Sequence, residues 1–96
     1  MEINFMGKDD VRSKALEDMI EKKLTKLDRF VKDNSTYDIM FSMESGDFVL
    51  SIQLLNDGDK YMAKAKGEDM YKNIDECISK LTTQLKKTKD IKRNRK

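Results

Sequence analysis

Apolar residues alternate with polar ones in four short segments, a pattern typical of strands that bury one face. The segments are residues 2–7, 36–44, 48–54 and 60–66. The side chains expected to point toward the core are Ile3, Phe5, Tyr37, Ile39, Phe41, Met43, Phe48, Leu50, Ile52, Leu54, Tyr61, Ala63 and Ala65. The opposite face of the last strand then carries three lysines, Lys60, Lys64 and Lys66.

Two other segments repeat apolar residues every three or four positions, as amphipathic helices do. The first begins after residue 10 and is expected to run for about twenty residues, as far as 33–35. Asp10 or Ser13 is expected to cap it, because either side-chain oxygen can accept an N–H of the first turn. The second helix is expected to begin after Asp69 as its cap. Its apolar stripe consists of Met70, Ile74, Cys77, Ile78, Leu81 and Leu85.

Glycine-containing turns separate the last three strands, at 45–47 and 56–59. Glycine favours tight reversals because it adopts positive φ at little steric cost. The element order is β-α-β-β-β-α, and a right-handed crossover through the first helix makes the first two strands parallel. The sequence therefore predicts an α+β fold, a four-stranded mixed sheet with both helices packed on one face.

Composition excludes several classes of protein. The chain of 96 residues has no His and one Cys, so it lacks the residues of a Cys/His zinc site, a Cys–His pair and a Ser–His–Asp triad. Cys77 falls on the apolar stripe and is expected to be buried and inert. The longest uncharged stretch has nine residues, 48–56, whereas a membrane helix needs roughly 18 to 20. We expect a cytoplasmic, non-enzymatic monomer without cofactor, metal, membrane or small-molecule substrate.

Charge is unevenly distributed although the net charge is only +2. Residues 86–96 contain seven Lys or Arg and one Asp, a net charge of +6, which leaves −4 on residues 1–85. This asymmetry fits either a polyanionic partner or a solvated basic tail. We expect a single domain over residues 1–89, followed by a basic C-terminal tail at 90–96.

Basic residues also gather on the polar sides of both predicted helices. In the first, Lys22, Lys26 and Arg29 share the spacing i, i+4, i+7. In the second, Lys80, Lys86 and Lys87 surround Thr83. Two basic ridges on one helical layer favour contacts with the phosphates and 2′-hydroxyls of folded RNA. Ordinary solvated faces are the alternative. Base-specific reading is not expected, because most aromatic side chains fall on inward strand positions.

A further group of segments carries a resemblance to a known family. These segments are 3–7 (INFMG), 21–30 (EKKLTKLDRF), 68–71 (EDMY), Ile74-Asp75, Lys80-Leu81 and 84–87 (QLKK). They resemble the ribosome hibernation promoting factor family, which includes the ribosome-associated inhibitor and is also called the sigma-54 modulation protein family. The similarity spans nearly the whole chain. The segment 68–71 with its following helix is the most specific of these segments.

The resemblance implies a fold like that of double-stranded RNA-binding domains. It also implies a site on the small ribosomal subunit, where the protein occupies the channel for mRNA and tRNA and blocks translation sterically under stress or in stationary phase. The expected partners are ribosomal RNA and, as further contacts, ribosomal proteins. The stop at Lys96 and the basic C-terminal tail resemble the short form of the family.

Carried over by position, the resemblance also implies the residues that contact RNA. The expected RNA-binding residues are Lys22, Lys23, Lys26, Arg29, Lys80, Lys86, Lys87 and Lys89. Secondary candidates are Lys64, Lys66, Lys92 and Arg93. Thr83 departs from the pattern, because the family commonly has Arg there. The alternatives are a general double-stranded RNA binder and a protein–protein regulator of transcription, the role implied by the sigma-54 label.

Overall fold

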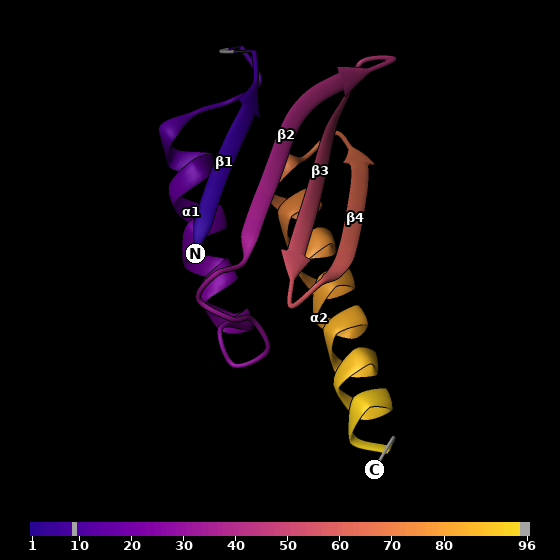
Figure 1. The fold of residues 1–96 in the computed structure, drawn as a ribbon. Coiled ribbons are helices and arrows are strands. Elements are labelled where there is room, and N and C mark those ends of the chain that lie inside the picture. Colours follow the sequence, from indigo (N-terminus) through magenta and orange to yellow (C-terminus); the bar gives the residue numbers. More distant parts are fainter. Residues whose placement is uncertain (9, 95–96) are drawn as a thin grey trace.

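Four strands and two long helices make up the protein (Figure 1). The computed structural model describes residues 1–8 and 10–94, with side chains described as far as residue 88. The elements in order are β1 (Glu2–Gly7), α1 (Lys14–Leu24), the short 3₁₀ helix η1 (Thr25–Leu27), β2 (Thr36–Glu44), β3 (Asp47–Asn56), β4 (Asp59–Gly67) and α2 (Met70–Asn94).

The strands form one mixed sheet in the order β1-β2-β3-β4. β1 pairs with β2 in parallel, with Ile3 opposite Tyr37, whereas β2–β3 and β3–β4 are antiparallel. Both helices lie on the same side of the sheet, α1 behind β1 and α2 behind β3 and β4 (Figure 1). The predicted fold class and topology are therefore confirmed.

The core lies between this sheet face and the two helices. Tyr37, Ile39, Leu50 and Ile52 are completely buried there, as predicted. Met43 was expected among them, but this prediction is wrong, because 47% of Met43 is exposed. β1 ends at Gly7, opposite Phe41. β2 therefore extends beyond the end of β1, and Met43 has no neighbouring strand on the β1 side. On the other sheet face, which no helix covers, Met6, Met40, Met62 and Leu55 are exposed.

The first helix is shorter than predicted. Ser13 caps α1, its Oγ accepting the N–H of Leu16 at 3.2 Å. The α-helix ends at Leu24, and the chain continues through η1 into turns closed by bonds to the third preceding residue, such as Phe30 N–H to Leu27 O at 2.9 Å. Leu27 and Val31 are nevertheless buried, so these turns keep the apolar positions directed at the core.

α2 is capped by Asp69, whose carboxylate accepts the N–H of Tyr71 at 2.9 Å, as predicted. Every residue of the predicted stripe is buried, and the Cys77 thiol donates to the Leu50 carbonyl at 3.6 Å. The α2 backbone continues to Asn94, so the boundary proposed at 89/90 falls within a helix. Within the described part of the chain, no helix has the length and apolar character required to span a membrane.

Gly7 is the position where backbone space is most restricted. Its φ is +133°, and a Cβ there would lie 2.5 Å from the Phe41 carbonyl oxygen. We expect Gly7→Ala to lower the free energy of unfolding by about 2 kcal/mol or more, since both the backbone conformation and the contact oppose a side chain. Urea unfolding measures this loss. Gly46→Ala is the matched control, because its φ is +85° but its Cβ meets nothing within 4 Å. Equal losses in the two variants would contradict the account.

A buried thiol and a buried tyrosine hydroxyl make the stability of the protein depend on pH. Burial raises the pKa of the Cys77 thiol from 9.0 to about 11 and that of the Tyr37 hydroxyl from 10.0 to about 12. The folded protein therefore retains these protons at pH values where the unfolded chain loses them. Their contribution to stability is complete below pH 9 and is lost as the pH rises toward 12. Between pH 8 and 11, the free energy of unfolding measured in urea should decline less for the double variant Cys77→Ala with Tyr37→Phe than for the wild type. Parallel declines would contradict this.

Candidate nucleic-acid interface

The basic residues of the first predicted ridge lie where the chain leaves α1. Lys22 is in the last turn of α1, Lys26 is in η1 and Arg29 is in the turn that follows. All three side chains are exposed, and Lys22 and Lys26 have no ion-pair partner among the described side chains. The Arg29 guanidinium lies over the Phe30 ring, 4.9 Å from its centroid. These three cations are available to an anionic partner.

Lys23 differs from its neighbours because it connects the two helices. Its ammonium lies 2.7 Å from the Asp75 carboxylate of α2, and only 24% of its side chain is exposed. An opposite charge at this distance offsets much of the attraction that Lys23 would exert on a phosphate. In this structure Lys23 joins α1 to α2.

Lys80 is similarly engaged within the protein. Its ammonium donates to the Lys64 carbonyl at 2.7 Å and lies 3.0 Å from the Glu76 carboxylate. Gln84 donates in the same way to the Met62 carbonyl at 2.7 Å. These side chains cover the outer edge of β4, where unpaired carbonyls would otherwise be exposed. Lys80 therefore protects a sheet edge.

The remaining candidates divide between α2 and the opposite side of the sheet. Lys86 and Lys87 are exposed on α2, within two turns of Thr83. Lys64 and Lys66 lie on the sheet face away from the helices, and Lys64 is 3.6 Å from Glu44. The structure thus separates these two lysines from the helical basic residues. Lys89, Lys92 and Arg93 belong to the α2 backbone, but their side chains lie outside the described residues.

A cavity of about 240 Å³ joins the first basic ridge to α2. Its lining comes from the segment after η1, from β3 and β4 near the turn that joins them, and from α2. The lining residues are Arg29, Phe30, Lys32, Asn56, Asp57, Tyr61, Leu85 and Thr88. Arg29 therefore lines the same cavity as Leu85 and Thr88 of α2, the two residues that flank Lys86 and Lys87 in the sequence. Sequence reasoning missed Lys32 and Asn56, since their role depends on the contact between two distant turns.

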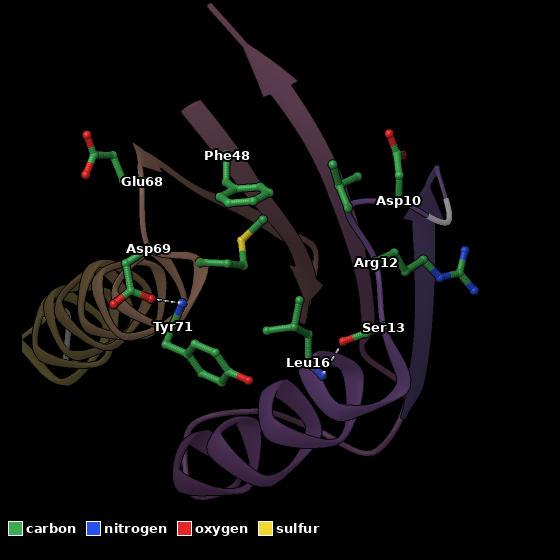
Figure 2. A pocket seen from close by; sticks show the side chains of 10 residues that line it. Asp10, Arg12, Ser13, Leu16, Phe48, Glu68, Asp69 and Tyr71 are labelled. Atoms are coloured by element: carbon green, nitrogen blue, oxygen red, sulfur yellow. Dashed lines mark hydrogen bonds between the residues drawn. The ribbon is translucent and has the colours of Figure 1, made fainter. Parts of the chain in front are cut away.

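The opposite end of the helical layer is acidic. A cavity of about 430 Å³ lies between the N-termini of α1 and α2, and Figure 2 shows Asp10, Glu68 and Asp69 around it. Among the described residues that line it, Arg12 is the one cation, and its Nε lies 2.6 Å from the Glu17 carboxylate. Tyr71 is 50% exposed and lies at this cavity (Figure 2). The N-terminal ends of the two helices therefore carry a group of acidic side chains, whereas Lys22, Lys26 and Arg29 lie at and beyond the C-terminal end of α1.

The described part of the chain holds no group of three or more Cys, Asp or Glu side chains arranged to bind a metal ion. Among the described side chains, the pKa of Cys77 is raised by burial, which keeps the thiol protonated at neutral pH. The geometry instead offers an exposed basic surface, which we call the basic end: Lys22, Lys26, Arg29, Lys86 and Lys87. Such a surface can hold phosphates.

Two curated proteins of similar sequence carry the same name. Ribosome hibernation promoting factor from Escherichia coli K12 is 33% identical over 91 residues, and that from Klebsiella oxytoca is 32% identical over 90 residues. Each alignment covers 94% of this chain and 95% of the relative.

Two solved structures also resemble this chain over most of its length. A ribosomal subunit interface protein from Coxiella burnetii superposes with a TM-score of 0.79 at 30% identity, covering 94% of this chain and 99% of that one. The N-terminal domain of Thermus thermophilus Protein Y superposes with a TM-score of 0.80 at 27% identity, covering 92% and 99%. The family model described as sigma 54 modulation protein / S30EA ribosomal protein matches residues 3–93. The protein therefore belongs to the sigma 54 modulation protein / S30EA ribosomal protein family.

Proposed function

We propose that this protein is a ribosome hibernation factor of the cytoplasm, which occupies the mRNA and tRNA channel of the small ribosomal subunit and blocks translation sterically. The observation that carries the proposal is the basic end, where exposed cations come from two separate elements and Arg29 lines one cavity together with Leu85 and Thr88 of α2. The names and structures of the relatives support the ribosome as the partner.

The basic end suits RNA because its charges are fixed by the fold. Lys22, Lys26 and Arg29 are carried by α1, η1 and the turn that follows, whereas Lys86 and Lys87 are carried by α2. The Lys23–Asp75 ion pair at 2.7 Å links α1 to α2. Cations held in such a frame position a protein on the RNA backbone without reading bases. Inhibition then follows from excluded volume, and no catalytic step is involved.

Sedimentation with ribosomes tests this proposal against its alternatives. The protein should sediment with small subunits in a sucrose gradient, and an excess of unrelated duplex RNA should leave most of it bound. Loss of the protein to the competitor would favour a general double-stranded RNA binder. Absence from the ribosomal fractions, with or without competitor, would leave the transcriptional regulator as the better reading.

Binding should depend strongly on salt, because each lysine that contacts a phosphate releases condensed counterions. Replacing Lys86 and Lys87 with Ala should weaken binding to small subunits and reduce the slope of log Kd against log salt by about one per lost contact. Filter binding between 50 and 200 mM salt measures both. The control is Lys14→Ala with Lys72→Ala, which removes the same charge outside the basic end and should leave the slope unchanged. Equal slopes for the two double variants would place the interface elsewhere.

A further inference from the structure

The 240 Å³ cavity at the basic end has a composition suited to a single nucleotide. Its apolar lining includes Phe30, Tyr61 and Leu85, and two cations, Arg29 and Lys32, also line it. A nucleotide likewise combines a flat apolar base with a charged phosphate. The cavity therefore offers a surface for each part.

Arg29 supplies a flat surface as well as a charge. Its guanidinium carbon lies over the Phe30 ring, 4.9 Å from the ring centroid, and the side chain is exposed. This cation–π contact restrains the guanidinium. Unstacked RNA bases commonly pack on such guanidinium planes. Lysine carries the same charge but cannot provide this plane.

Lys32 is placed to meet the phosphate. Its ammonium lies 3.3 Å from the Asp57 carboxylate, and both side chains are largely exposed, at 64% and 46%. An exposed ion pair of this kind contributes little to stability, about 0 to 1 kcal/mol. A phosphate can therefore displace Asp57 from Lys32 at small cost.

Asn56 fixes the segment that carries these groups. It is 6% exposed, its Oδ1 accepts the N–H of Lys32 at 2.9 Å, and its Nδ2 donates to the Phe30 carbonyl at 3.0 Å. The two bonds clamp residues 30–32 against the β3–β4 turn. Asn56 thus acts as a positioning residue for Arg29 and Lys32.

We propose that this cavity seats one unpaired nucleotide of the bound RNA, with its base stacked on Arg29 and its phosphate beside Lys32. The inference rests on the proposed function for the identity of the RNA, and it adds a stacking site to a surface otherwise described by charge. Stacking tolerates any base, so the site strengthens binding without selecting sequence.

The substitution Arg29→Lys separates stacking from charge. It should weaken binding to small subunits about fivefold or more, the lower end of a stacking contribution, with the salt slope unchanged. Arg12→Lys makes the same substitution at the acidic end and should bind as the wild type does. Wild-type affinity for Arg29→Lys would overturn the stacking site while leaving ribosome binding intact.

Side-chain amide signals in an NMR titration test the cavity without the ribosome. With a single-stranded adenosine hexanucleotide as the probe, the Asn56 amide signals should shift. The Asn73 signals should stay in place, because that amide donates to the Phe48 carbonyl at 3.0 Å near the other end of the molecule. Shifts at Asn56 without ribosome binding would reject the proposed function but keep the cavity as an RNA site. Unshifted Asn56 signals would overturn the inference.

The positioning role of Asn56 predicts coupling. In an Asn56→Ala background, Arg29→Lys should weaken binding to small subunits less than it does in the wild type, whereas the effect of Lys87→Ala should be the same in both backgrounds. Additive effects of Asn56→Ala and Arg29→Lys would reduce Asn56 to a structural residue and would contradict its positioning role.

Discussion

The double variant Lys26→Glu with Arg29→Glu is expected to lose inhibition of translation in vitro, with at least about a hundredfold weaker binding to small subunits. Both residues are exposed, and they lie in the short segment between α1 and β2. Reversal replaces two attractions with two repulsions in a geometry that the fold holds fixed. Neither side chain belongs to the core, so the variant should unfold at nearly the wild-type denaturant concentration.

A matched variant separates local contact from total charge. Lys14→Glu with Lys72→Glu changes the net charge by the same amount at exposed positions outside the basic end. It should remain an inhibitor, with only a modest loss of association rate. Translation of a reporter mRNA across a range of protein concentrations measures both variants. Full activity of the Lys26→Glu, Arg29→Glu variant would make the basic end a solvated face.

Deletion of residues 90–96 should have the second-largest effect, but of a different kind. The segment contains four Lys or Arg and one Asp, so its removal lowers the net charge by three. Electrostatic steering chiefly accelerates encounter, so we expect association to slow on the order of tenfold. The basic end remains, and inhibition should return in full at higher protein concentration.

Stopped-flow association and a translation titration distinguish these two effects. A sequence-scrambled segment of the same composition, joined after Lys89, serves as the control for charge and should restore most of the association rate. If the truncated protein fails to inhibit even at saturating concentration, the C-terminal segment rather than the folded layer is the functional element.

The sequence predicted the sheet well because strand periodicity and core burial coincide. The alternation in 60–66 places Tyr61, Ala63 and Ala65 inside, as observed. The end of α1 could not be predicted in this way. Leu24, Leu27 and Val31 keep helical spacing and are all buried, although the last two lie beyond the α-helix. Successive tight turns and a continuing α-helix give the same apolar spacing over such a short segment.

The basic surface was predicted less completely than the fold. Helical phase identified Lys23 and Lys80 as polar positions, but it could not show that Asp75 and the Lys64 carbonyl engage them. Those partners belong to other elements and become neighbours only in the folded chain. For the same reason the clamp formed by Asn56 has no signal in the local sequence.

The most direct test of the central claim is tethered hydroxyl-radical probing of small-subunit RNA. With the buried thiol replaced by Cys77→Ala, an iron chelate can be attached at the exposed position of Thr83 on α2 through Thr83→Cys. If the protein occupies the mRNA and tRNA channel, the chelate should strongly cleave the RNA that lines it. The same chelate at Ser51→Cys, on the sheet face away from the helices, should cleave that RNA much less. Stronger cleavage from Ser51 than from Thr83, or cleavage confined to RNA outside the channel, would contradict the central claim.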